Sequence, residues 1–445
     1  MVAARHRAPA TALVRLGETR LAHADAGALA GVRREAWRRF LETGIPTTRV
    51  EDWKYARIDA LLARPFAAPG PAEPAAGTLA AAFAGGPRAR RLILANGRVL
   101  AGPSHVGGLP PGMRVLSLAE AIARFPERVA EVLAEVPDPG PFTDLNTALA
   151  EDGAWIELEE GVRPEVPLQL LFVAVGEPSA VMAHPRVVVR LGAGARLHLI
   201  ESHLAEGAGH VLTNLVLQVR LDEGAELVHE KLQAAEGGHA LLARTSVRLA
   251  TGARLRDRVA TVGGDFVRNE LDVRLEGEGG EALMAGLYLP RDREQVDTLV
   301  RVHHHAPRCH SDQFYKGVVE DRARAAFAGR ITVHPGAQDT DAYQQNRNLL
   351  LSDEAEVDAK PELEIFADEV RCSHGATVGG LDEAALFYLR TRGIGRAAAE
   401  ALLTYAFAGE VVTRFDDPEL AAQLRRAILA RVPGGGMLDP EGLVA

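Results

Sequence analysis

A short motif recurs along the middle of the chain and limits the folds that this sequence can adopt. It reads Leu-Gly-Ala-Gly-Ala-Arg-Leu at residues 191–197, Leu-Asp-Glu-Gly-Ala-Glu-Leu at 221–227 and Leu-Ala-Thr-Gly-Ala-Arg-Leu at 249–255. A looser copy begins at Leu275 and a later one at Leu351. The successive first leucines are 30, 28 and 26 residues apart, and the last step, of 76 residues, spans about three such periods.

This period predicts a solenoid in which each repeat forms one coil. Short runs rich in Val and Leu flank the motif, for example at residues 168–175 and 215–221. Each coil would contain about two strands whose aliphatic side chains point inward, and glycine would supply the positive φ of the corner. The alternative is a β-sandwich, in which turns recur about every 8–12 residues and Asn-Gly or Asp-Gly hairpins are common. Such signals are scarce here, so we predict a mainly β protein with a parallel β-helix core.

Helical composition flanks this core on both sides. Apolar residues recur at three-to-four spacing at 26–41 and 117–133, and again at 382–390, 396–407 and 418–432. We therefore predict a mostly helical region at residues 1–150, a β-helix core at 151–380 and a C-terminal helical region at 381–445.

Composition and charge exclude several classes of protein. The 445 residues have a net charge of −10 without a Lys/Arg block, so no nucleic-acid partner is expected. The N-terminus leads into no apolar signal segment, and the longest apolar run, at 166–175, is far shorter than the roughly 20 residues of a membrane span. Two cysteines, Cys309 and Cys372, form no disulfide framework. We expect a cytoplasmic protein without a membrane segment.

Signatures of common enzymes are missing from the sequence. None of the four lysines follows a glycine, which excludes a Walker A loop, and neither a Gly-x-Ser-x-Gly elbow nor a Cys-x-x-Cys pair is present. Two cysteines cannot supply the four thiolates that an iron–sulfur cluster usually takes. We expect neither an enzyme nor a chain that holds such a cluster alone.

One histidine-rich segment resembles a metal site. Four histidines and a cysteine lie within residues 303–310. In a strand, His303 and His305 would share one face. The segment contains no carboxylate to complete a site, and Pro307 indicates a turn. We therefore interpret it as a solvated strand end.

A second pair of candidate ligands lies near the end of the core. Cys372 and His374 stand at i and i+2, which places a thiol and an imidazole on one strand face. Such a pair can bind iron or zinc, but it supplies only two ligands. On spacing alone, a small buried cysteine beside a hydrogen-bonded histidine is the favoured interpretation.

One motif, Cys-Ser-His-Gly-Ala-Thr-Val-Gly at 372–379, continues through Leu-Asp-Glu to residue 394. With this motif, the stretch 302–394 resembles the SufD family of the SUF system for iron–sulfur cluster assembly. The paralogous SufB family usually has Glu after this histidine and a cysteine in the segment that corresponds to 352–360, where this chain has none. The other matching segments are 304–307, 311–318, 327–331, 344–352 and 360–365, with weaker ones at 51–55 and 145–149.

The resemblance implies an architecture, partners and a site. It implies a right-handed parallel β-helix between two helical domains, with a SufB-type paralogue bound through the β-helix and a SufC-type ABC ATPase bound through the C-terminal helices. It also implies that His374 and Cys372 are metal ligands shared with SufB, where transient iron or a nascent cluster is bound. ATP-driven dimerisation of SufC would open the interface.

Two other functions compete with this one. A structural homodimer without a metal role would need none of these ligands, and a homodimer of the isolated chain is also expected to be possible. Some parallel β-helices are carbohydrate-active enzymes, but these are generally secreted and carry charged clusters along one groove, which the repeats do not show.

Overall fold

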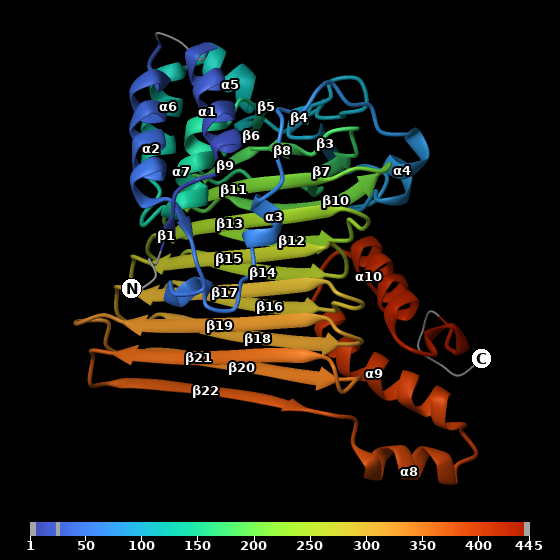
Figure 1. Cartoon of the computed structure of the whole chain (residues 1–445). Coiled ribbons are helices and arrows are strands. Elements are labelled where there is room, and N and C mark those ends of the chain that lie inside the picture. The colour runs from blue at the N-terminus through green and yellow to red at the C-terminus, as the bar shows by residue number, and fades with distance from the viewer. Residues whose placement is uncertain (1–5, 24–26, 440–445) are drawn as a thin grey trace, which may run out of the picture.

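The centre of the molecule is a β-solenoid made of two long sheets that face each other (Figure 1). The computed structural model describes residues 6–23 and 27–439. Sheet I contains, in spatial order, β22 (Val370–Gly379), β20 (Thr340–Leu350), β18 (His310–Val319), β16 (Glu281–Tyr288), β14 (Arg254–Thr261), β12 (Glu226–Gln233), β10 (Arg196–Glu206), β7 (Leu168–Val175), β3 (Arg90–Ala95) and β4 (Arg98–Val99). Sheet II contains β21 (Glu356–Ile365), β19 (Arg324–Val333), β17 (Gln295–His304), β15 (Phe266–Leu275), β13 (His239–Leu249), β11 (Val211–Leu221), β9 (Arg186–Leu191), β6 (Gly153–Leu158) and β5 (Met113–Ser117), with β8 (Val181–Ala183) beside β11.

The chain alternates between the two sheets, so neighbouring strands of one sheet belong to successive coils. They pair in parallel and in register, and Leu221 lies beside Leu249, which lies beside Leu275. The antiparallel pairs within these sheets are β3 with β4 and β5 with β6, at the first coils. This parallel stacking confirms the predicted β-helix and excludes the sandwich.

Helices lie at both ends of the chain, as predicted. The N-terminal part contains β1 (His6–Arg7), α1 (Thr11–His23), α2 (Leu29–Thr43), β2 (Ile45–Pro46), a 3₁₀ turn at Glu51–Trp53, α3 (Asp59–Leu62), α4 (Ala76–Ala81), α5 (Leu118–Arg124), α6 (Pro126–Ala134) and α7 (Gly140–Leu149). The C-terminal part contains α8 (Glu383–Thr391), α9 (Arg396–Val412), α10 (Pro418–Arg431) and a 3₁₀ turn at Gly435–Met437. No described helix is long and apolar enough to cross a membrane.

Two details of the helix prediction change. Residue 26, the predicted start of one helix, lies outside the described residues. The single helix predicted at 117–133 is two helices, because Phe125 departs from the helical conformation, with φ −148° and ψ 61°, and Pro126 begins a new helix. Proline lacks an N–H for the preceding turn but fits the first turn of a helix.

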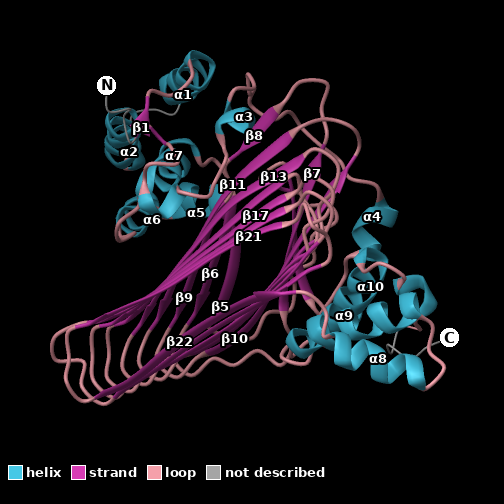
Figure 2. Ribbon diagram, turned by 60° about the horizontal axis from the view of Figure 1, so that its bottom comes forward, coloured by secondary structure: helices cyan, strands magenta, loops and turns pink. Residues whose placement is uncertain are grey.

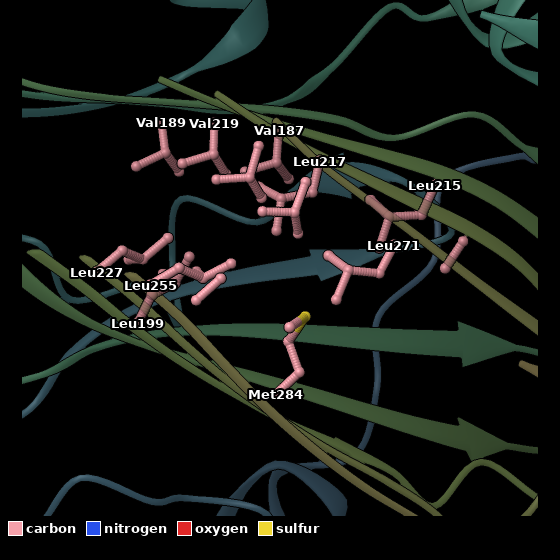
Figure 3. Close-up of a cluster of buried hydrophobic side chains, with 14 of the residues drawn as sticks. Val187, Val189, Leu199, Leu215, Leu217, Val219, Leu227, Leu255, Leu271 and Met284 are labelled. Carbon is pink, nitrogen blue, oxygen red and sulfur yellow. The ribbon is translucent and has the colours of Figure 1, made fainter. Parts of the chain in front are cut away.

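Aliphatic side chains fill the space between the sheets. Val187, Val189, Leu217 and Val219 of sheet II face Leu199, Leu227, Leu255 and Met284 of sheet I (Figure 3). Each of these side chains is almost fully buried, and burial of one such side chain contributes about 1.5–3 kcal/mol. Figure 2 shows the N-terminal helices α1, α2 and α5–α7 beside sheet II and α8–α10 beside sheet I.

The glycine motif forms the corner that leads from sheet II to sheet I. Gly194, Gly224, Gly252 and Gly279 all have φ between 62° and 68°. The copy predicted at Leu351 is wrong, because it lies at the opposite corner, between β20 and β21. The positions equivalent to Leu275 are His304, Val333 and Ile365. Both corners need short polar turns that end in a small residue, so their sequences look alike.

The two kinds of corner glycine should tolerate alanine differently. At Gly252 a Cβ would meet open space, and only the positive φ opposes it, at about 1 kcal/mol. At Gly277 a Cβ would run into the backbone of Ala250 and Thr251 in the coil above. We expect Gly277→Ala to lower the free energy of unfolding by about 3 kcal/mol or more, measured by urea denaturation with Gly252→Ala as control. An equal loss of unfolding free energy in Gly277→Ala and Gly252→Ala would contradict the close packing at Gly277.

Polar side chains replace aliphatic ones at one end of the core. The interior ion network consists of Glu201, His203, His229, Lys231 and Asp257, all buried. His229 bonds Asp257 at 2.7 Å and Glu201 at 3.2 Å, and Lys231 lies 3.0 Å from Glu201. Burial alone would lower the pKa of His229, but the hydrogen bonds to Asp257 and Glu201 raise it to about 9. His229 is therefore a cation held between two carboxylates.

Removal of this cation should destabilise the solenoid in a pH-dependent manner. We expect His229→Gln to cost about 3–5 kcal/mol near pH 6.5, because two buried carboxylates lose a partner. Since the folded pKa of His229 exceeds its ordinary value of 6.5, its stabilisation is full below pH 6.5 and is lost as the pH rises through about 9.

The difference in melting temperature between this variant and the unmodified chain should therefore narrow between pH 6.5 and 10. His105→Gln, at an exposed site, serves as the control and should change little at either pH. A difference that stays constant over this range would refute the charged state of His229.

Candidate functional site at the last coil

Within the described residues, the solenoid ends without a cap. Its last coil, β21 and β22, forms the open end: β21 pairs with β19 and β22 with β20, and no described strand pairs with their outer edges. Figure 1 shows β22 at the bottom of the stack, with α8 to one side. Backbone N–H and C=O groups along these edges are thus available to another chain.

Exposure changes sharply at the open end. The inward-facing positions of β20 are buried, namely Gln344, Asn346 and Asn348. The positions that pair with them in β22 are exposed, namely His374, Ala376 and Val378. The inward-facing residues of the last coil are exposed because no further coil of the described chain covers them. This surface is therefore suited to contact with a partner.

Cys372 and His374 lie on this inward face. They pair with Ala342 and Gln344, so both point to the same side of β22. Cys372 is half-buried against the small apolar cluster that contains Ile331 and Val333, and burial raises the pKa of its thiol. His374 is exposed, and its ring makes no hydrogen bond to any described residue. The hydrogen-bonded histidine that the spacing favoured is therefore not found.

This pair can provide part of a metal site but not all of it. No third histidine, cysteine or carboxylate of the described chain joins Cys372 and His374 within ligand distance. A thiolate and an imidazole are suitable ligands for iron. Additional ligands would have to come from a molecule that covers the open end.

Large apolar side chains are exposed at both ends of β22, at the corner before it and on the helix after it. Phe366 follows β21, and Phe387 and Tyr388 lie on α8. Phe366 and Phe387 are 61% and 67% exposed, and Ile365 and Val378 of the last coil are also exposed. Exposed large apolar side chains at these two places are candidate binding surfaces.

The C-terminal helices differ in how firmly they are held. In α9, the carbonyl of Phe407 and the carboxylate of Glu410 bind the buried Lys316 of β18. Arg431 of α10 pairs with Glu294 at 2.6 Å. In α8, by contrast, only Leu386 is buried. Helices α9 and α10 are fixed to the solenoid, whereas α8 extends from it with its aromatic side chains exposed.

The histidine-rich segment has three different environments. His304 is fully buried and bonds the Ser311 hydroxyl at 2.9 Å, which corrects its interpretation as part of a solvated strand end. His310 packs beside Tyr343. His303 and His305 lie together with His334, which comes from the next coil. No local pattern singles out His334, although a period of about 30 residues places it one coil after the segment 303–305.

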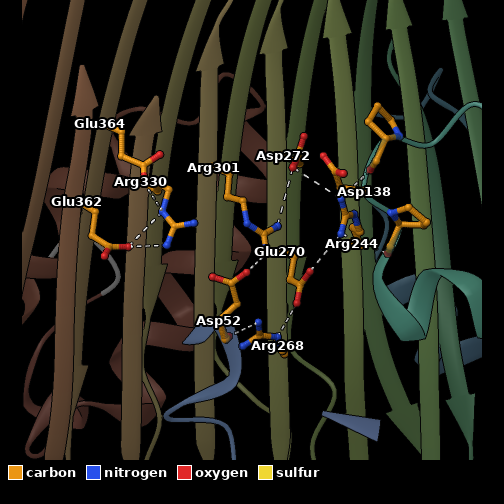
Figure 4. Close-up of polar contacts among 12 residues, drawn as sticks. Asp52, Asp138, Arg244, Arg268, Glu270, Asp272, Arg301, Arg330, Glu362 and Glu364 are labelled. Atoms are coloured by element: carbon orange, nitrogen blue, oxygen red, sulfur yellow. Dashed lines mark hydrogen bonds and ion pairs between the residues drawn. The ribbon is translucent and has the colours of Figure 1, made fainter. Parts of the chain in front are cut away.

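An outer-face ladder of charged residues attaches the N-terminal part to sheet II. It includes Arg244, Arg268, Arg301 and Arg330 on successive strands, with Glu270 and Asp272 between them (Figure 4). Burial would raise the pKa of Glu270, but Arg268 and Arg301 lower it to about 2. The ladder lines a cleft of about 620 Å³ between sheet II and the segment around Trp53.

The segment 51–55 docks on this ladder. Arg301 pairs with Asp52 at 2.7 Å, Arg268 donates to the carbonyl of Asp52, and its guanidinium lies 3.8 Å from the Trp53 ring centroid. The Glu-Asp-Trp-Lys-Tyr motif therefore has a structural role: it joins the helical part to the coils that lead to the open end.

Comparisons with known proteins cover nearly the whole chain. Residues 11–170 match the SufBD protein N-terminal region, and residues 172–407 match the SufBD core domain of SUF system FeS cluster assembly. The iron–sulfur cluster assembly protein SufD of Escherichia coli K12 is 32% identical over 403 residues, which is 89% of this chain and 91% of that protein.

Two further relatives agree with this match. The SufBD family protein slr0076 of Synechocystis is 30% identical over 396 residues, 87% of each chain. SufD of Bacillus subtilis is 26% identical over 302 residues, 66% of this chain and 68% of that protein. Because the core match spans more than half of the chain and carries the open-ended solenoid described above, the chain belongs to the SufBD family of SUF-system iron–sulfur cluster assembly proteins.

Proposed function

We propose that this chain is a non-catalytic, SufD-type scaffold subunit whose open end binds a SufB-type paralogue. One observation carries the proposal: the last coil exposes two strand edges and an inward face on which Cys372 and His374 lie. A paralogous solenoid could add strands to these edges, which satisfies backbone groups and buries Val378 and its neighbours. Such a complex would form in the cytoplasm, where both cysteines remain free thiols.

The proposed site for iron and the nascent cluster lies between the two solenoids. Cys372 and His374 supply a thiolate and an imidazole, and the partner supplies the remaining ligands. In this proposal iron is a substrate at the site, since two cysteines cannot supply the four thiolates that a cluster usually takes. Burial raises the pKa of the Cys372 thiol, so the approach of a cation is what favours its deprotonation.

The C-terminal helices are the proposed binding site of a SufC-type ABC ATPase. The exposed Phe387 and Tyr388 of α8 offer an aromatic surface, while α9 and α10 are held by Lys316 and Arg431. Movement of the ATPase would act first on α8. The Lys316–Glu410 contact would then pass this displacement to β18, two strands from the open end in sheet I.

The two proposed contacts can be separated by mutation. With only this chain tagged, co-expression with SufB- and SufC-type proteins of the same genome should yield a complex that contains both. Val378→Asp should lose the SufB-type protein and keep the ATPase, since it charges only the last coil. Phe387→Asp should lose the ATPase and keep the SufB-type protein. Leu41→Asp, at an exposed site on α2, should lose neither protein.

Gel filtration and mass analysis of the purified material measure these outcomes. Retention of the SufB-type protein by Val378→Asp would contradict binding at the open end. A homodimer that Val378→Asp dissociates, with neither partner retained by the unmodified chain, would favour the structural homodimer instead.

His374→Ala tests the role of the ligand pair. The side chain is exposed and unpaired, so the variant should fold and assemble normally. In a strain that carries only this variant, activities of iron–sulfur enzymes should fall by about tenfold or more. Ser373→Ala, on the opposite face of the same strand, is the control. Normal enzyme activities with His374→Ala would refute the role.

A further inference from the structure

Three imidazole rings meet at the corner that leads from sheet II to sheet I. His303 lies near the end of β17, His305 in the turn that follows, and His334 directly after β19. Parallel pairing sets His303 beside Thr332, and the backbone N–H of His334 donates to the carbonyl of His304 at 2.9 Å. One nitrogen of each ring lies within 4.8 Å of the others. We call this group the histidine corner.

The three rings of the histidine corner stack on one another, with the centroids of His305 and His334 4.0 Å apart, and they have no polar partner in the described chain. None of the three makes a side-chain hydrogen bond or ion pair to a described residue, whereas the buried His229 and His304 both do. The Nε2 atom of His334 is sealed from solvent without a partner. An unpaired buried nitrogen normally destabilises a fold. A ligand bound to this atom would remove that loss of stability.

Burial and nearby charges both act on the three rings. Burial lowers the pKa of His303 to about 4 and lowers those of His305 and His334 as well, and metal binding requires the neutral form of an imidazole. The carboxylates of Asp272, Glu276 and Glu364 lie near enough to offset part of the charge of a bound cation, whereas the guanidinium of Arg274 acts on all three rings and opposes it.

We propose that His303, His305 and His334 form a binding site for one divalent first-row transition-metal ion. Neutral imidazoles prefer zinc, iron, copper or nickel to magnesium or calcium. Bonds of about 2.0–2.1 Å to one ion would draw the three nitrogens to about 3.4 Å from one another. Because the rings are stacked, their lone pairs converge on one ion only after rotation, which the exposed His305 side chain allows.

The site would keep a free coordination position. Three protein ligands leave the fourth position of a tetrahedral ion to water or an incoming ligand. His303 lines the cleft on the outer face of sheet II, which provides an approach for the ion. The site is separate from Cys372 and His374, which lie on an inward face, and it does not depend on the function proposed for that pair.

Calorimetric titration of the untagged, chelator-treated full chain tests the site. We expect one Zn²⁺ per chain, and likewise one Fe²⁺ under anaerobic conditions. His305→Ala and His334→Ala should each raise Kd at least about tenfold. His310→Ala removes a histidine from the same segment but not from the histidine corner, and it should leave Kd unchanged. A Cys372→Ser, His374→Ala double variant should also bind normally.

Two results would overturn the proposal. One is a Kd that neither His305→Ala nor His334→Ala changes. The other is saturable binding abolished by the Cys372 and His374 double variant alone. Melting temperatures in the absence of metal show whether the variants fold, and only chains with an intact histidine corner should melt at a higher temperature when Zn²⁺ is added.

Discussion

Parallel hydrogen bonding from one coil to the next is the constraint on which the rest of the molecule depends. It holds equivalent residues of successive coils side by side, as in the pairs that join Leu221, Leu249 and Leu275. This pattern does not end by itself, because each coil pairs with the previous coil along one strand edge and presents unpaired backbone groups along the other. At the first coils, the antiparallel strands β4 and β5 cover the outer edges of the two sheets. At the last coil nothing in the described chain does so, and this asymmetry creates the candidate site.

The same stacking explains why the polar clusters consist of residues far apart in sequence. His229 and Asp257 are neighbours because β12 pairs with β14, and Asp272 faces Arg301 because β15 pairs with β17. His334 joins His303 and His305 in the same way. The residues of each cluster therefore occupy equivalent positions in successive coils, one period apart in the sequence. Inward positions produce the interior ion network, outward positions produce the outer-face ladder, and the corner produces the group of histidines.

Sequence reasoning succeeded where the physical signal was local. A glycine with positive φ followed by an inward alanine marks a corner, and its recurrence predicted the solenoid. Alternation along a strand placed Cys372 and His374 on one face, although it could not show that His374 is exposed, because exposure depends on the absence of a further coil. His334 was missed since it is separated from His305 by a whole coil. The copy at Leu351 was misplaced because both corners use similar turn residues, and the period alone does not distinguish them.

The return of the C-terminal helices along the solenoid has a consequence for how this fold can change in length. The backbone N–H of Gly85 donates to Asp417, and Gln423 of α10 donates to the carbonyl of Phe83, so the end of the chain is attached beside its first coils. An inserted coil would move β22 by about 4.8 Å along the stack. Helix α10 would stay in contact with residues 83–85. Repeat proteins usually gain or lose units freely. Here the C-terminal helices connect the last coil to the first coils, so the number of coils and the length spanned by α8–α10 must change together.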